Sequence, residues 1–156
     1  MIEKLKTVYY CEFCSKKYFR RDHCAKHENK CTMNVNRECS MCNIIANAEG
    51  IEIPIPSGKM PTLQEYLSKS DYALLTEYQA AAAKRKSLVS SCADWSKPEM
   101  AQMSNNVQKY FEEVYMAYVY CPMCRLTWVR TNYVNRIVNY AYKTDLDAFW
   151  ELFNEL

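Results

Sequence analysis

The sequence predicts a mainly α-helical fold that carries small β-hairpin zinc knuckles. Three observations predict this fold: cysteines gather in CxxC pairs, apolar residues recur at helical spacing through the middle of the chain, and glycine is scarce. Only 2 of the 156 residues are glycine, which argues against turn-rich sandwiches, barrels and glycine-rich phosphate loops. The length fits one domain, or one domain with a small satellite.

The 9 cysteines are the strongest sign of function. The charged start MIEKLK leads into no signal-peptide core, and no apolar run approaches the roughly 20 residues of a membrane helix. We therefore expect an intracellular protein without membrane contact: cytoplasmic, nuclear if eukaryotic, or in the host cytoplasm if viral. In such compartments cysteines bind metal more often than they form disulfides.

The first predicted ligand set is Cys11, Cys14, His27 and Cys31. Zinc prefers four nitrogen or sulfur ligands in a tetrahedron. This spacing supplies two thiolates from a hairpin knuckle and two ligands one turn apart on a helix. His23 lies on the same helix face as His27, but choosing it would leave His27 without a role, so we favour His27.

The second predicted ligand set joins two distant pairs, Cys39 with Cys42 and Cys121 with Cys124. Each CxxC pair is one zinc knuckle, and two knuckles complete a four-cysteine site. The alternative is that one pair binds the metal of another protein, or none. Two complete sets predict two zinc ions per chain. Because both sets are closed, with no open position for a reacting water, we do not expect an enzyme.

The chain between the two pairs reads as a helical insertion over 62–118. An extended connector with both glycines precedes it. A capping box at Thr62 and Glu65 begins a helix that extends to about residue 92 and can break near Lys69 or at the AAAAKRK stretch, residues 80–86. A second helix is predicted from a Ser96 cap to about residue 118, and the two should pack as a helical hairpin.

A strand and a helix are predicted directly after the last cysteine. Leu126 and Trp128 alternate with polar residues, which indicates a strand over 125–131. Residues 132–142 read as a helix that uses Tyr133, Ile137, Tyr140 and Ala141.

A last helix is predicted over 145–155, with Phe149, Trp150 and Phe153 on one face. Packing of this face on the chain's own core is one interpretation, and a homodimer or another protein docked on it is the other. Four carboxylates on this helix would repel phosphate, so we expect it to be a docking element rather than part of a nucleic-acid surface.

Residues 9–31 resemble the classical two-cysteine, two-histidine (C2H2) zinc finger family, in a variant with cysteine as the last ligand. Tyr9 and Tyr18 match the family's aromatic positions, and Cys24 stands where the family has leucine. The resemblance implies a ββα finger over 1–33, joined to a helical domain over 34–156. The pattern YxCxxCxKxY, HExxC and NxNRxCxxC is also similar to small zinc-finger proteins of bacteriophages, which would make host machinery a target.

The charge distribution, together with the alignment of the finger helix to the family's helix positions, indicates binding to nucleic acid. Residues 1–43 carry nine basic against five acidic residues, and 125–144 carry four basic and none acidic, so positive charge flanks the cysteine pairs. The alignment implies that the finger helix presents four side chains to bases and reads a G-rich subsite near 5'-GGG-3'. These four are Arg20, Asp22, His23 and Lys26. Backbone contacts are expected from Lys16, Lys17, Arg125, Arg130 and Arg136.

The leading interpretation is therefore a zinc-binding protein that binds DNA as a regulator or accessory factor. The alternative is a zinc-stabilised adaptor or inhibitor that binds protein. A sequence pI near 8.0 is lower than the value above about 9 that is typical of dedicated nucleic-acid domains, so both interpretations stay open.

Overall fold

The computed structural model describes residues 7–84, 94–132 and 134–154. Within these residues the fold is mainly helical, with one two-stranded antiparallel sheet. The elements are β1 (Tyr9–Tyr10), β2 (Lys17–Tyr18), α1 (Arg21–Glu28), α2 (Ser40–Asn47), α3 (Leu63–Tyr66), α4 (Lys69–Lys84), α5 (Pro98–Tyr110), a π-helical turn (Phe111–Tyr115), α6 (Met116–Tyr118), α7 (Pro122–Thr131) and α8 (Tyr142–Asn154).

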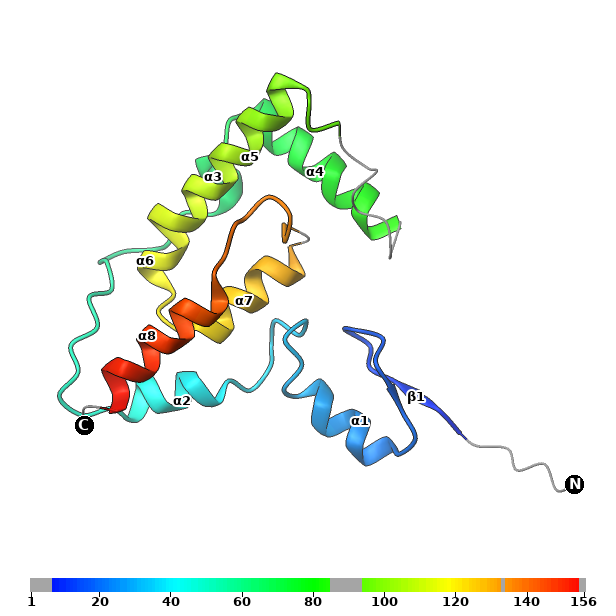
Figure 1. The fold of residues 1–156 in the computed structure, drawn as a ribbon, viewed down its shortest axis with the longest axis vertical. Coiled ribbons are helices and arrows are strands. Elements are labelled where there is room, and N and C mark those ends of the chain that lie inside the picture. Colours follow the sequence, from blue (N-terminus) through cyan, green and yellow to red (C-terminus); the bar gives the residue numbers. More distant parts are fainter. Residues whose placement is uncertain (1–6, 85–93, 133, 155–156) are drawn as a thin grey trace, which may run out of the picture.

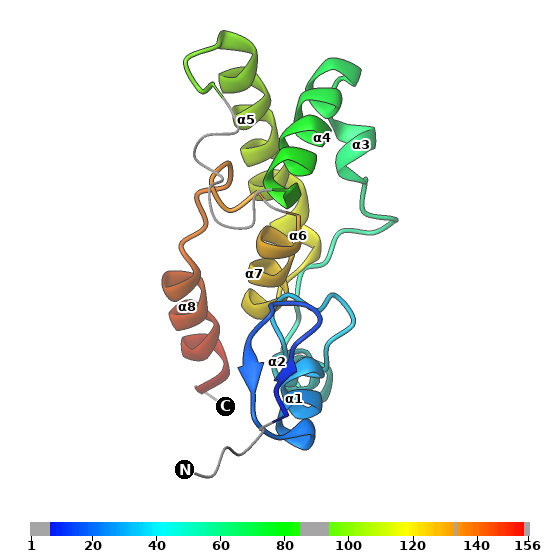
Figure 2. The ribbon, with the colours of Figure 1, turned by 90° about the vertical axis from the view of Figure 1, so that its right-hand side faces the viewer.

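The molecule is elongated, with different elements at its two ends. α4 and α5 lie at one end, and β1, α1 and α2 lie at the other, as both views show (Figures 1 and 2). α7 lies between these ends, beside α8, with which it is in contact. In the described part of the chain, no helix has both the length and the apolar character needed to cross a membrane.

The predicted helix after residue 62 forms as two helices, α3 and α4. Thr62 Oγ1 accepts a hydrogen bond from the Glu65 backbone at 3.2 Å, and Glu65 Oε2 accepts one from the Thr62 backbone at 2.6 Å. This confirms the capping box. Ser68 Oγ then accepts a hydrogen bond from the Asp71 backbone at 3.1 Å, so the break near Lys69 is also confirmed. Residues 85–92 lie outside the described residues.

α5 begins where its proline predicts. Its N-cap is Lys97 rather than Ser96, and Pro98 takes the first helical position, where a missing N–H costs nothing. α4 and α5 pack against each other as predicted. Asn106 donates a hydrogen bond to the buried Asp71 carboxylate at 2.8 Å. The apolar stripe of α5 is buried: Met100, Met103, Val107 and Tyr110.

The segment 125–131 is helical, so the strand predicted there is wrong. α7 begins at Pro122, a favoured first helical residue. Four of its residues are buried: Pro122, Arg125, Thr127 and Val129. Three of them, at 122, 125 and 129, recur at helical spacing. Because an arginine occupies one of these positions, the apolar residues alone show only the misleading alternation of Leu126 and Trp128.

The helix predicted over 132–142 is also wrong, since residues 135–138 form turns and a helix begins again only at Tyr142, the first residue of α8. The Ile137 and Val138 amides both donate to the Val134 carbonyl at 2.8 Å, and no helical ladder follows. Asparagines at 132, 135 and 139 favour such turns because their side chains compete for backbone hydrogen bonds. Ile137 is buried, Tyr140 is half-buried and Ala141 is exposed, and Tyr133 lies outside the described residues.

The last helix, α8, begins at Tyr142, three residues before its predicted start, and is described to Asn154. Phe149 is buried. Its ring centroid lies 4.6 Å from that of Phe153 and 5.2 Å from that of Trp150. The Arg125 guanidinium pairs with Asp145 at 2.5 Å. α8 therefore packs on the chain itself, although Trp150 keeps 37% exposure.

Trp128 on α7 packs against an aromatic group of the core. Its ring centroid lies 4.8 Å from that of Tyr115, 5.4 Å from that of Phe111 and 6.0 Å from that of Tyr110. These three partners come from the end of α5 and from the π-helical turn that follows it. The aromatic cluster thus joins α5 to α7.

Replacing Leu75 with alanine should destabilise the fold by about 2–5 kcal/mol, because this fully buried side chain leaves a cavity. Val35→Ala, at 69% exposure, is the control and should change the free energy of unfolding by less than about 0.5 kcal/mol. Urea denaturation of the metal-saturated protein measures both values. Equal, small effects would mean that α4 does not pack as described.

Candidate metal centres and basic surface

Cys11, Cys14, His27 and Cys31 come together in the N-terminal module. Their ligand atoms all lie within 4.8 Å of one another, and Cys14 Sγ is 3.2 Å from His27 Nε2. The predicted grouping is confirmed. His23, the alternative ligand, is exposed on α1 and lies outside the cluster.

The hairpin and α1 hold this cluster in place. The Cys11 amide donates to the Lys16 carbonyl at 3.0 Å and the Ser15 amide to the Cys11 carbonyl at 2.9 Å, which closes the knuckle. Ser15 has φ 58, a left-handed conformation that disfavours a side chain. Cys24, which stands where the family has leucine, is buried with Cys11 and Cys31 against Tyr9, Tyr18 and Met33.

Cys39, Cys42, Cys121 and Cys124 form the second cluster, with all four sulfur atoms within 4.8 Å of one another. Cys39 Sγ lies 3.4 Å from Cys121 Sγ, and Cys42 Sγ lies 3.3 Å from Cys124 Sγ. The pairing across the insertion is confirmed.

The β-hairpin form expected for the second pair of knuckles is wrong. Cys39 is the N-cap of α2 and Cys121 is the N-cap of α7, and the second cysteine of each pair lies in the first helical turn. The strands among the described residues are β1 and β2 of the first module. Two helix N-termini therefore meet at this cluster, and their partial positive charge stabilises thiolates.

Both clusters have the size of a tetrahedral metal site and could hold metal ions. A metal with bonds of about 2.3 Å to sulfur places its ligand sulfurs about 3.8 Å apart, close to the distances between the paired sulfurs here. All four positions of each tetrahedron are filled by protein side chains. When all of them bind, no position remains for a reacting water.

Burial and crowding raise the pKa of three of these thiols, Cys31, Cys42 and Cys121. Burial is the main cause that raises the pKa of Cys31 to about 11 and that of Cys42 to about 12. A hydrogen bond with Cys124, and then burial, raise the pKa of Cys121 well above its ordinary value. A cation is therefore needed to hold these groups together as thiolates, and its binding releases protons.

Cys14 differs from the other thiols. Burial acts to raise its pKa, but hydrogen bonds from His27, the Lys16 backbone and neighbouring thiols outweigh burial and lower the pKa to about 7. This exposed thiol is the first cluster's most acidic ligand among those with a shifted pKa.

Arg37 is a functional residue that the sequence analysis missed. Its guanidinium donates to Cys39 Sγ at 3.4 Å and to Cys124 Sγ at 3.7 Å, and its Nε donates to Thr127 Oγ1 at 2.9 Å. It thus contacts one cysteine from each pair. Four thiolates around a divalent cation carry excess negative charge, which a guanidinium offsets. An arginine two residues before a CxxC pair was the available signal.

The predicted boundary at residue 33 is crossed by hydrogen bonds. Asn34 donates its side-chain amide to the Glu28 carbonyl at 2.8 Å, and the Glu38 amide donates to the Asn29 carbonyl at 2.8 Å. Arg130 donates to Thr32 Oγ1 at 2.7 Å. The segment after Cys31 is therefore an ordered connection between the two clusters.

The four predicted base-facing residues lie together on α1 and its N-cap, Arg20. Arg20, Asp22, His23 and Lys26 are all exposed. Arg20 donates from Nε to Asp22 Oδ1 at 3.0 Å and from Nη2 to Asp22 Oδ2 at 2.8 Å. This hydrogen bonding raises the pKa of Arg20 and lowers that of Asp22. The guanidinium is thus charged and oriented.

The predicted backbone-contacting residues differ in accessibility. Lys16, Lys17 and Arg136 are exposed, and Arg130 is half-buried. Arg125 is buried at 7% exposure, pairs with Asp145 and donates to the Met116 carbonyl at 2.8 Å. Its predicted contact with phosphate is therefore wrong, because its charge is used inside the protein.

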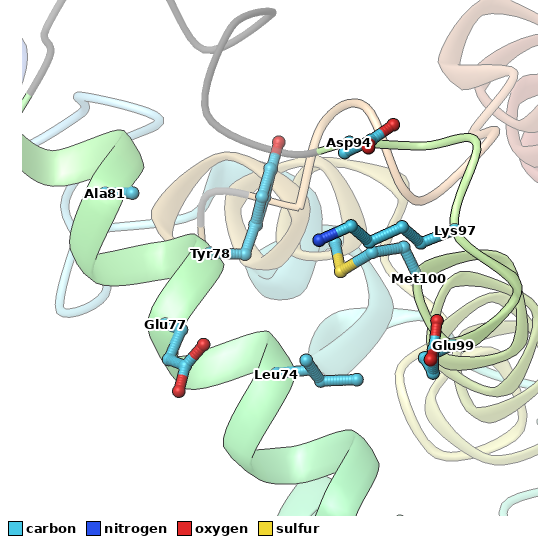
Figure 3. A pocket seen from close by; sticks show the side chains of 8 residues that line it. All are labelled: Leu74, Glu77, Tyr78, Ala81, Asp94, Lys97, Glu99 and Met100. Atoms are coloured by element: carbon cyan, nitrogen blue, oxygen red, sulfur yellow. The ribbon is translucent and has the colours of Figure 1, made fainter.

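A hollow of about 510 Å³ lies between α4 and the start of α5 (Figure 3). Tyr78 and Met100 form part of its apolar wall. Among the described residues, no cysteine or histidine lines it. The charged groups in the described lining are three carboxylates and one ammonium group, which disfavour phosphate: Glu77, Asp94, Glu99 and Lys97.

Comparison of the chain with protein-family models, curated proteins and solved structures found no match.

Loss of one ligand should affect one module. Cys11→Ser should unfold residues 7–33 and leave the core around Trp128 intact, whereas Cys39→Ser should loosen the helices, because the two ligand sets share no residue. Amide hydrogen exchange, read segment by segment, measures this. Cooperative unfolding of the whole chain by either change would contradict the separation.

Removal of the Arg37 guanidinium should weaken only the second centre. Arg37→Ala should lower the metal affinity of the second centre by about 10- to 100-fold, as is typical when a group that orients ligands is lost. The metal affinity of the first centre should be unchanged. Competition with a chelator, followed by cobalt(II) absorption, reports both centres. Arg136→Ala, which removes an exposed arginine, is the control, and an equal loss in both variants would refute the role of Arg37.

Proposed function

We propose that this is a zinc protein that binds nucleic acid, as a DNA-binding regulator or accessory factor. Residues 9–31 form its finger, and the first helix of that finger faces the DNA. The observation that carries the proposal is the exposed group of Arg20, Asp22, His23 and Lys26 on a helix whose position is fixed by a metal cluster.

Zinc is the metal that the ligands favour. Thiolate and imidazole ligands select zinc over magnesium or calcium, which prefer oxygen. Two closed four-ligand sets support structural zinc at both centres. The order β1, β2, α1 around the first set agrees with the resemblance to the classical zinc finger family.

The exposed side chains of α1 suit the major-groove edge of guanine. An arginine can donate two hydrogen bonds to O6 and N7, and lysine or histidine can donate to the same acceptors. Asp22 holds Arg20 through two hydrogen bonds, which lowers the entropic cost of ordering the guanidinium at a base. The subsite proposed for this finger is therefore G-rich.

Phosphate contacts would come from exposed lysines and arginines outside the finger helix. Lys16 and Lys17 are exposed on the hairpin, and Arg136 is exposed in the turns after α7. Such contacts add affinity without sequence preference. One finger seldom binds DNA tightly alone, so these contacts are needed.

A protein-binding adaptor or inhibitor is the second candidate, and the surface beside α8 favours it. An open hollow of about 710 Å³ lies between α2 and α8, and its lining is half apolar and half polar: Ile44, Ala48, Phe153, Asn43, Asn47 and Glu49. Trp150 and Leu152 keep 37% and 40% exposure on α8. Exposed aromatic and aliphatic side chains around a hollow are typical of protein docking sites.

Arg20→Ala should weaken binding to a G-rich duplex by about 5- to 150-fold and relax the preference at one base. Lys16→Ala should instead weaken all duplexes alike and reduce the salt dependence, because it removes a phosphate contact. Titration of labelled duplexes at several salt concentrations measures both effects.

Two outcomes would contradict the DNA proposal. An Arg20→Ala variant that binds G-rich and A-rich duplexes as the parent does would remove the finger helix as a reader of sequence. A protein partner that stays bound after nuclease treatment, and is lost in Trp150→Ala, would favour the adaptor.

A further inference from the structure

The N-terminal module exposes aromatic rings that its own core does not use. Phe19 keeps 64% exposure, Tyr10 keeps 59% and Phe13 keeps 42%. The miniature core is filled by other rings, those of Tyr9 and Tyr18. Large exposed aromatic side chains in so small a module indicate a binding surface.

The hairpin register and one contact beside it place two of these rings near Lys17. Tyr9 pairs with Tyr18, and both point inward onto the metal cluster, whereas Tyr10 pairs with Lys17, and both are exposed. Since side chains alternate along a strand, Tyr10 and Lys17 lie on the outer face of the hairpin. Phe19 follows the end of β2, and Lys17 Nζ lies 5.1 Å from its ring centroid, so this ring is beside the same face.

The outer hairpin face (Tyr10, Lys17 and Phe19) is distinct from the base-facing side of α1. α1 packs on the inner face of the hairpin, where the ring centroids of Tyr18 and His27 are 5.2 Å apart. Residues on the exposed side of α1 therefore point away from the outer hairpin face. The two surfaces could bind different ligands.

The charge around these rings favours a polyanion. The segment SKKYFRR, residues 15–21, holds four basic residues and no acidic residue. All four are exposed, and Arg20 is paired with Asp22, so among the described residues Lys16, Lys17 and Arg21 supply the unpaired positive charge. A surface for a protein partner would not need this density of positive charge, whereas phosphate groups do.

We propose that the outer hairpin face binds single-stranded nucleic acid. Phe19 and Tyr10 stack on successive bases, and Lys17, beside Phe19, pairs with a phosphate. Stacking needs a free base face, which a duplex does not offer and a single strand does. The proposal rests on the proposed nucleic-acid function, but not on duplex reading by α1.

The test compares binding of a short oligothymidine and of the G-rich duplex to the full zinc-loaded chain. Phe19→Ala should weaken oligothymidine binding by about 5- to 150-fold, the range for loss of one stacking ring, and change duplex binding far less. Phe19→Trp should restore single-strand binding. Ile55→Ala, which truncates another exposed apolar side chain of 58% exposure, should have no effect.

The two proposals fail separately. Oligothymidine binding that is the same in Phe19→Ala and the parent overturns the single-strand site, whatever the duplex does. Duplex affinity that is unchanged by Arg20→Ala overturns base reading by α1. A loss of oligothymidine affinity in Phe19→Ala would still support the single-strand site. If Phe19→Ala instead abolishes self-association without changing oligothymidine affinity, the outer hairpin face is a contact between copies of the chain.

Discussion

The four-cysteine cluster is the constraint on which the arrangement of the helices depends. It joins Cys39 to Cys121 across 82 residues, so α3 to α6 form a loop closed at its base by four sulfur atoms. The ends that meet are the first turns of α2 and α7, whose backbone dipoles favour thiolates. Arg37 contacts both cysteine pairs and offsets their charge.

The cluster reaches the core through one helix. α7 starts at the second cysteine pair and carries Trp128 into the rings of Phe111 and Tyr115. From the same helix, Arg125 pairs with Asp145 of α8. A metal bound at the N-terminus of α7 would therefore set the position of the aromatic cluster and of α8 together. The first cluster, in contrast, stabilises only its hairpin and α1, a module too small for a conventional core.

Ligand sets and caps were predictable from the sequence because their chemistry depends on residue type and spacing. The CxxC pairs, the Thr62 and Glu65 capping box and the α5 stripe are of this kind. α7 was not predictable from apolar spacing, because its buried face includes Arg125, whose charge is satisfied only by groups distant in sequence. The role of Arg37 was hidden for the same reason, since its contacts depend on how the two cysteine pairs meet.

The central claim is that two metal ions, one per cluster, hold this fold together. Native mass spectrometry of the intact chain, before and after chelation, tests it most directly when combined with amide exchange on the same samples. The expected result is a mass excess of two zinc ions per chain, with protection around both clusters that is lost when the metal is removed. One ion per chain, an iron–sulfur absorbance, or protection that survives complete removal of metal would contradict the claim.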